Sequence, residues 1–156
     1  MEYFREEIRR IMICVNMIDG IYAKGAKKIG IKYNTLALFY ALDDGLPHSQ
    51  KEICEQWLIP KTTINTIVRE CMEAGYVILE PAGQMKEKEI RITERGREFA
   101  GPILSQFYEV ERRAMERTLG GFSREFVEAV EHFTNYLKEE AGRLPLENRP
   151  YEQKRQ

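Results

Sequence analysis

A pair of helical patterns separated by a proline constrains the fold of this chain more than any other feature. Ser49 and Glu52, three residues apart, form a capping box that begins the first helix. Ile59 and Pro60 end that helix, and Pro60 suits the first turn of the next helix, which extends to Gly75. Two short helices joined by a tight turn are therefore predicted, which is the helix-turn-helix arrangement.

A β-hairpin is predicted directly after the second helix. Residues 76–79 (YVIL) are β-formers, residues 81–83 (PAG) turn the chain, and residues 89–93 (EIRIT) alternate polar and apolar side chains. A short apolar helix over residues 34–42 precedes the helix pair. We therefore expect a mainly α fold with a small β-hairpin wing, a winged helix-turn-helix region over residues 33–93.

The second helix of the pair is amphipathic, and its polar face has a distinctive composition. At about 100° per residue, the apolar face collects Ile64, Ile67, Val68, Cys71 and Met72. The polar face carries short hydroxyl and amide groups and one arginine, namely Thr62, Thr63, Asn65, Thr66 and Arg69. Threonine and asparagine are weak helix formers, but they approach base edges and phosphates closely. This face is typical of a recognition helix that enters the DNA major groove with its N-terminal half.

Candidate DNA contacts extend beyond this helix to its neighbours. The full set is Ser49, Lys51, Lys61, Thr62, Thr63, Asn65, Thr66, Arg69, Lys86 and Lys88. Over residues 49–91, however, seven acidic residues oppose six basic ones, and the whole chain has a net charge of −1. DNA binding would therefore depend on the local arrangement of the cations and would weaken steeply with salt. The alternative is a winged helix used only for protein–protein contact.

An apolar stripe precedes the winged region. Its residues recur at gaps of four and three, which is the spacing of a helix–helix seam: Phe4, Ile8, Ile11, Val15, Ile18 and Tyr22. Residues 24–32, which contain two glycines and four lysines, are expected to form a connector.

Two further helices are predicted after the wing. Thr93 can cap the first, whose stripe is Phe99, Ile103, Phe107, Val110 and Ala114. Gly101-Pro102 should kink or loosen it, and Gly120-Gly121 should end it. Ser123 is expected to cap the last helix, whose stripe is Phe126, Val130, Phe133 and Leu137. Residues 143–156 are expected to be a flexible tail.

Four motifs follow one another across the winged region. SQKEI opens the first helix, TTINTIV lies in the second, CMEAGYV joins the helix to the wing, and IRITERG leaves the wing. In this order they resemble the MarR family of winged helix-turn-helix transcriptional regulators, and the resemblance covers about residues 1–142. It departs at Gln84-Met85-Lys86, where family members often carry Asp-x-Arg, so Lys86 keeps the charge but not the bidentate geometry.

The resemblance implies a function and a partner. Such a protein is a sequence-specific double-stranded DNA-binding transcriptional regulator, here expected to be a ligand-responsive repressor that acts as a homodimer on a pseudo-palindromic operator. In this family the helices flanking the winged region, here residues 1–32 and 94–142, intertwine to form the dimer. The expected interface residues are Phe4, Ile8, Ile11, Val15, Phe126, Val130, Phe133 and Leu137. A helix–helix seam within one chain is the alternative.

The resemblance also implies a possible small aromatic or amphipathic effector. Family members commonly bind such ligands between the dimer helices and the winged helix. The candidate ligand-binding residues are Tyr22, Tyr33, Phe39, Tyr40 and Trp57. Aromatic residues at helical spacing can equally be ordinary core residues.

The cysteines and histidines favour no other chemistry. Cys14, Cys54 and Cys71 lie among apolar neighbours and are expected to be small buried hydrophobic residues. A redox sensor of the same family is an alternative for Cys14, although that sensor cysteine would fall near Ile8. The two histidines have no convincing catalytic or metal partner, so neither an enzyme nor a metal or cofactor site is expected. No apolar run reaches the roughly 20 residues of a membrane helix, and the start of the chain does not resemble a signal peptide, so a cytoplasmic protein is expected.

Overall fold

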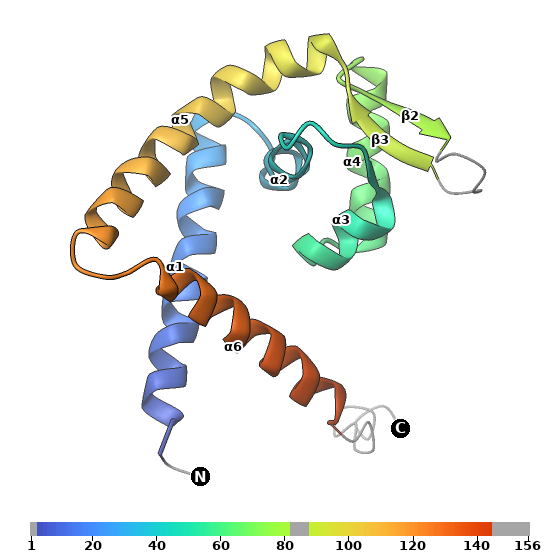
Figure 1. Ribbon diagram of the computed structural model, residues 1–156. Helices are drawn as coiled ribbons and strands as arrows, with labels where there is room; N and C mark the ends of the chain where they lie inside the picture. The colour runs from blue at the N-terminus through green and yellow to red at the C-terminus, as the bar shows by residue number, and fades with distance from the viewer. Residues whose placement is uncertain (1–2, 82–87, 145–156) are drawn as a thin grey trace, which may run out of the picture. The chain divides into compact units, whose positions relative to one another are not determined.

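The computed structural model describes residues 3–81 and 88–144. The chain divides into two compact units, Met1–Glu109 and Val110–Gln156. The helices are α1 (Arg5–Ile29), α2 (Tyr33–Leu42), α3 (Gln50–Trp57), α4 (Lys61–Glu73), α5 (Glu94–Leu119) and α6 (Glu125–Gly142). The strands are β1 (His48–Ser49), β2 (Val77–Pro81) and β3 (Lys88–Ile92) (Figure 1). The predicted mainly α fold with a β-hairpin wing is confirmed.

The sheet contains one strand more than the sequence predicts. Strands β2 and β3 form the expected antiparallel hairpin, with Val77 opposite Ile92 and Pro81 opposite Lys88. The short strand β1 adds to the other edge of β3 and gives the order β1-β3-β2. A strand of two residues has no periodicity to read, because alternation needs at least four residues to be recognised.

The turn between α3 and α4 forms as predicted. The hydroxyl of Ser49 accepts a hydrogen bond from the backbone N–H of Glu52 at 3.2 Å, and the Glu52 carboxylate accepts one from the Ser49 N–H at 2.7 Å. Leu58 adopts a left-handed conformation (φ 50°) and is exposed, whereas Ile59 is buried. This sharp reversal anchors the turn in the core and starts α4 at Lys61.

The core of the first unit is built around α2. This helix is apolar along nearly its whole length and buries Leu36, Leu38, Phe39 and Leu42. Other elements contribute Ile53, Ile64, Val68, Val77, Ile90 and Leu104. A helix that is apolar all round is stable only when other elements surround it, and here α1, α3, α4 and β3 all contact α2.

Thr93 joins the wing to α5, as predicted. Its hydroxyl accepts a hydrogen bond from the Gly96 N–H at 3.0 Å and donates to the Gly75 carbonyl oxygen at 2.7 Å. The rings of Tyr76 and Phe99 stack beside this junction, with centroids 4.3 Å apart. One threonine therefore caps α5 and fixes the chain reversal after α4 at the same time.

The connector predicted over residues 24–32 is wrong for most of its length, because α1 continues to Ile29. Gly25 lies inside the helix against the ring of Phe107, where a Cβ atom would come within 2.8 Å of the ring. Ala26 is fully buried, and the left-handed Gly30 (φ 86°) ends the helix. Packing of this last stretch outweighs the low helix propensity of Gly25.

One prediction for the later helices also needs correction. Helix α5 continues through Pro102, and the kink or loosening expected there stays a prediction. Ser123 does not cap α6, because its hydroxyl contacts the Glu125 carboxylate and the N-cap residue is Arg124, without a side-chain cap hydrogen bond. The predicted turn at 81–83 lies mostly outside the described residues, and the wing motif at 84–86 and the tail from residue 145 lie entirely outside them.

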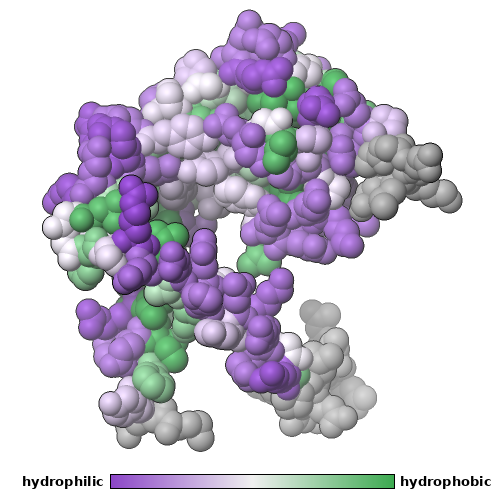
Figure 2. Space-filling model, in the orientation of Figure 1, coloured by the Kyte–Doolittle hydropathy of each residue, from purple (hydrophilic) through white to green (hydrophobic). Residues whose placement is uncertain are grey.

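Apolar side chains remain exposed along the helices of each unit. On α1, the exposed residues include Ile8, Ile11, Val15 and Ile18, and Figure 2 shows hydrophobic side chains gathered along this helix. On α6, Val130 is 58% exposed and Leu137 50%, while Phe126 and Phe133 are half-buried. In the part of the chain that the structure describes, no helix combines the length and apolar character needed to cross a membrane.

Candidate nucleic-acid interface and ligand cavity

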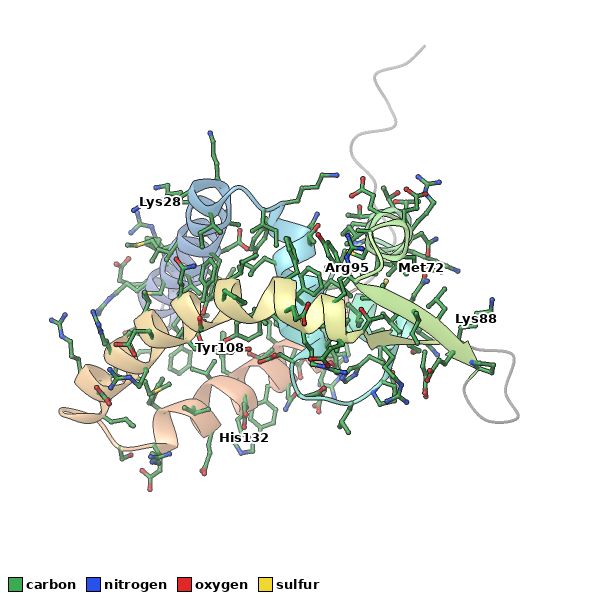
Figure 3. All side chains as sticks on the ribbon, turned by 90° about the horizontal axis from the view of Figure 1, so that it is seen from above. Lys28, Met72, Lys88, Arg95, Tyr108 and His132 are labelled. Carbon is green, nitrogen blue, oxygen red and sulfur yellow. The ribbon has the colours of Figure 1, made fainter. Side chains whose placement is uncertain are left out.

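Helix α4 divides into a buried and an exposed face almost as the sequence predicts. Ile64, Ile67, Val68 and Cys71 are buried in the core. The sequence predicts Met72 on the same face, but its side chain, labelled in Figure 3, is 41% exposed. Met72 lies at the edge of the apolar face, in the last turn of α4, where the core no longer covers it.

The polar face of α4 carries the predicted reading residues. Thr62, Asn65, Thr66 and Arg69 are exposed, and Thr63 is half-buried. The Thr66 hydroxyl donates to the Thr62 carbonyl oxygen at 3.1 Å, and its own oxygen can still accept a hydrogen bond. This face can accept hydrogen bonds from bases and contact a thymine methyl group.

Three predicted lysines from three elements lie around one depression beside this face. Lys51 of α3, Lys61 of α4 and Lys88 of β3 line it, together with Gln50, Cys54, Glu55 and Leu79, and its volume is about 450 Å³. Lys88 is the first residue of β3, one of the two strands of the wing (Figure 3). Gathering cations from separate elements raises the local positive potential although the net charge is near zero.

Two predicted DNA contacts differ from the rest in their placement. Ser49 is only 7% exposed, and its hydroxyl is engaged in the α3 cap. Lys86 lies outside the described residues. We therefore leave Ser49 out of the candidate interface.

Several acidic side chains of this region have partners that reduce their repulsion of an anion. Glu70 forms an ion pair with Lys32 at 2.7 Å, and Glu80 forms one with Arg91 at 2.8 Å. Glu70 is therefore paired with a lysine outside residues 49–91, whereas the Glu80–Arg91 pair uses one acidic and one basic residue of the sequence count.

A second depression borders the other side of the α4 face. It has a volume of about 440 Å³ and is lined by Lys32, Tyr33, Asn34, Thr62, Thr63, Thr66, Ile67 and Glu70. Residues from the start of α2 thus share this recess with the polar face of α4. Tyr33 also lines the cavity described next.

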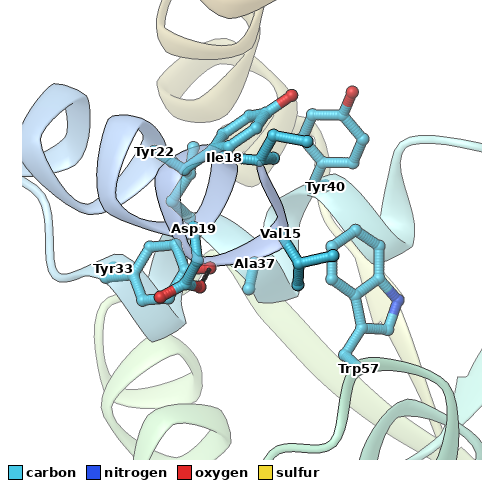
Figure 4. Close-up of a pocket in the computed structure, with 9 residues that line it drawn as sticks. Val15, Ile18, Asp19, Tyr22, Tyr33, Ala37, Tyr40 and Trp57 are labelled. Carbon is cyan, nitrogen blue, oxygen red and sulfur yellow. Dashed lines mark hydrogen bonds between the residues drawn. The ribbon is translucent and has the colours of Figure 1, made fainter. Parts of the chain in front are cut away.

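An aromatic cavity lies between α1, α2 and the end of α3. Its volume is about 340 Å³, and it is lined by Val15, Ile18, Asp19, Tyr22, Tyr33, Leu36, Ala37, Tyr40 and Trp57 (Figure 4). Four of the five predicted ligand residues are thus brought together. The fifth, Phe39, is buried in the core, where it contacts the rings of Tyr76 and Phe99.

The aromatic rings of the cavity support one another. Tyr22 stacks on Phe107 with centroids 5.7 Å apart, and it meets Tyr40 edge to face at 6.4 Å. Tyr40 in turn lies 5.6 Å from Trp57. Contacts of this kind hold the rings in defined orientations, so the cavity exists before any ligand enters.

Sequence reasoning missed Asp19, the charged residue of this cavity. The Tyr33 hydroxyl donates to its carboxylate at 2.5 Å, and burial, together with this contact, raises the pKa of Tyr33 to about 12. A signal was present, because Asp19 lies four residues after Val15 and three before Tyr22, on the apolar side of α1. An acid on an otherwise apolar helix face is a candidate functional residue.

The cysteines occupy three different environments. Cys71 is buried, and desolvation raises the pKa of its thiol to about 11. Cys54 is half-buried, whereas Cys14 is exposed, which corrects the prediction that all three are buried. Among the described residues, no three His, Cys, Asp or Glu side chains gather in a way that could hold a metal ion. His48 instead contacts Asp44 at 2.9 Å.

Known proteins share both sequence and structural features with this chain. Residues 29–84 match the sequence profile of the MarR family. No curated protein matches the chain. A MarR family regulator from Neisseria meningitidis has a similar structure, with a TM-score of 0.69 and 20% identity over 88% of this chain and 94% of that one.

Two ligand-bound structures are also similar. MarR from Staphylococcus aureus, in complex with salicylate and kanamycin, aligns with a TM-score of 0.62 and 16% identity over 92% of this chain and 96% of that one. An organohalide-sensing transcriptional regulator in its 2,4-dichlorophenol-bound form aligns with a TM-score of 0.56 and 15% identity, over 89% and 82% of the two chains. Residues 29–84 thus match the MarR family profile, and over most of its length the chain shares the winged helix-turn-helix fold of these MarR family structures.

Proposed function

We propose that this protein is a sequence-specific double-stranded DNA-binding transcriptional regulator that acts as a homodimer on a pseudo-palindromic operator. In this proposal residues 33–93 bind DNA, and the helices of residues 1–32 and 94–142 form the dimer. The observation that carries it is the polar face of α4, where Thr62, Asn65, Thr66 and Arg69 stand exposed beside a depression lined by three lysines.

The lysines and the α4 face have separate roles in this proposal. Lys51, Lys61 and Lys88 hold phosphates and set the position of the helix, whereas the α4 side chains read base edges. Because phosphate contacts release counterions, DNA affinity should fall steeply as salt rises. A dimer is needed, since a single α4 presents few contacts and two recognition helices about one turn of DNA apart bind cooperatively.

We further propose that a small aromatic or amphipathic ligand in the cavity lowers DNA affinity, which makes the protein a repressor relieved by its ligand. Support comes from Tyr33, which lines both the cavity and the recess beside Thr62, Thr63 and Thr66. The adjacent Lys32 is paired with Glu70 of α4. A ligand that displaces Tyr33 would therefore move the start of α2, which borders the polar face of α4. To change DNA affinity, the ligand must favour one arrangement of this segment over the other.

The first test measures DNA binding by the combined substitution Thr62→Ala, Thr66→Ala and Arg69→Ala. Each base contact contributes about 1–3 kcal/mol, so affinity for DNA from upstream of the protein's own gene should fall at least about tenfold in fluorescence anisotropy. Lys28→Ala, which removes a cation from the last turn of α1, is the matched control and should bind almost as the parent does.

The same experiment separates DNA reading from a purely protein-binding winged helix. Light scattering first establishes that the triple variant has the parent's oligomeric state. If the variant, in that state, binds the DNA as tightly as the parent at every salt concentration, α4 does not read DNA. The winged helix would then be a protein–protein contact module.

A further inference from the structure

The residues that line the aromatic cavity include one charged side chain, the carboxylate of Asp19. Of its nine lining residues, eight are apolar or aromatic and the ninth is Asp19, and the lining includes no Lys, Arg or His. Asp19 is exposed at this cavity, and its carboxylate repels an anionic ligand and attracts a cationic one with a strength that solvent screens. The sign of this charge therefore restricts which ligands the cavity accepts.

Aromatic faces from three helices complement this charge. Tyr22 comes from α1, Tyr33 and Tyr40 from α2, and Trp57 from the end of α3. The π face of an aromatic ring is electron-rich, and rings grouped around a space bind ammonium groups through cation–π attraction. Figure 4 shows Asp19 and Tyr33 together on one side of the cavity and Trp57 on the other.

Asp19 is held in position, and its negative charge can attract a ligand cation. The Tyr33 hydroxyl donates to its Oδ1 atom at 2.5 Å. A carboxylate offers about four acceptor positions on its two oxygens, so this bond leaves others for a ligand. The raised pKa of Tyr33 keeps its hydroxyl protonated near neutral pH, so Tyr33 donates to Asp19 and does not add a negative charge of its own.

We propose that the cavity binds a small aromatic cation, with an ammonium nitrogen near Asp19 and an apolar ring against the side chains of Tyr40 and Trp57. The inference rests on the proposed function, because it names the ligand class for the same regulatory site. The volume of about 340 Å³ lies at the small end of ligand pockets, which fits one or two rings. Salicylate and 2,4-dichlorophenol, bound by two structurally similar regulators, carry or can acquire the opposite charge.

A fluorescence titration in the absence of DNA tests this ligand class. Trp57 is the only tryptophan of the chain and lines the cavity, so its emission reports on occupancy. Three probes of similar size are compared: phenyltrimethylammonium, benzyl alcohol and benzoate. We expect the cation to bind about threefold to thirtyfold more tightly than the neutral probe, and benzoate to bind most weakly. The proposal is overturned if benzoate binds as tightly as the cation, or if phenyltrimethylammonium does not change the emission of Trp57.

The variant Asp19→Asn removes the charge and keeps an oxygen that can accept from Tyr33. It should lower phenyltrimethylammonium affinity about threefold to tenfold and leave benzyl alcohol affinity unchanged. Glu7→Gln removes the same charge from an exposed position on α1 outside the cavity and should bind every probe as the parent does. Equal cation affinity in the parent and Asp19→Asn contradicts the role of Asp19.

A parallel measurement keeps this inference distinct from the proposed function. DNA affinity is measured by anisotropy with and without saturating phenyltrimethylammonium. A cation that binds through Asp19 but leaves DNA affinity unchanged upholds the ligand class and contradicts ligand control of DNA binding. Loss of DNA affinity in the α4 triple variant supports the proposal that α4 contacts bases. If the cavity at the same time binds benzoate more tightly than the cation, the proposal of a cationic ligand is overturned.

Discussion

Tyr33 shows how much one residue can connect in this fold. Its hydroxyl holds Asp19, its ring lines the aromatic cavity, and it also borders the recess beside α4. The sequence marked it only as an aromatic candidate for a ligand site. Its double position could not be predicted, because it depends on how closely α1, α2 and α4 approach one another in three dimensions.

The pKa of Tyr33 leads to a prediction about stability at high pH. Folding raises this pKa from an ordinary value near 10 to about 12, so the folded state favours the protonated form. The stabilisation is fully present below pH 10 and is lost as pH rises toward 12. The difference in unfolding free energy between the parent and Tyr33→Phe should therefore be constant from pH 7 to 9 and shrink above pH 10.

Urea denaturation at closely spaced pH values measures this difference. Tyr3→Phe removes an exposed hydroxyl elsewhere and should follow the parent curve throughout. A parent–Tyr33→Phe difference that stays flat up to pH 11.5 would show that the contact with Asp19 does not protect the phenol.

At the scale of elements, the patterns that were predicted correctly are those set by local rules. The Ser49–Glu52 capping box, the amphipathic face of α4 and the Thr93 cap depend on residues close together in sequence. The missed features depend on distant partners. Residues 24–29 are helical because Phe107 and the core receive Gly25 and Ala26, and β1 exists only because β3 lies beside it.

The junction of α5 with the wing gives a prediction for Gly96. A Cβ atom at this position would lie 2.1 Å from the Tyr76 carbonyl oxygen and 2.8 Å from the Ile92 side chain. Because a backbone atom cannot move aside cheaply, Gly96→Ala should destabilise the protein by about 1–3 kcal/mol or more. Thermal or urea unfolding measures the change.

Gly20→Ala is the matched control for that substitution. Gly20 lies within α1, and a Cβ atom there would meet nothing within 4 Å. Alanine should therefore be neutral or stabilise the helix by up to about 1 kcal/mol. Equal effects of the two substitutions would mean that the contact of Gly96 with Tyr76 does not limit packing.

At the scale of the whole molecule, the exposed apolar stripes on α1 and α6 provide a test of the proposed homodimer. Ile8 and Val130 are each more than 40% exposed in a single chain, so changing them to lysine costs little packing within that chain. In the proposed homodimer the same lysines would be buried without a partner. Ile8→Lys and Val130→Lys should therefore each shift the mass in solution from twice 18.3 kDa toward one chain.

Light scattering over a range of protein concentrations measures this shift. Arg10→Ala, on the other side of α1, should keep the parent's mass. A parent that already has the mass of one chain at every concentration would contradict the homodimer, and the stripes would then need a different partner.

The shared position of Tyr33 has a thermodynamic consequence. If one side chain forms part of both the cavity wall and the recess beside α4, the two sites draw on the same conformational equilibrium. Reciprocity then requires operator DNA to weaken ligand binding by the same factor by which the ligand weakens DNA binding. Titrating phenyltrimethylammonium against Trp57 emission, with and without saturating operator, should give that factor from the cavity side. The protein bound to its operator would thus bind the ligand more weakly than the free protein does.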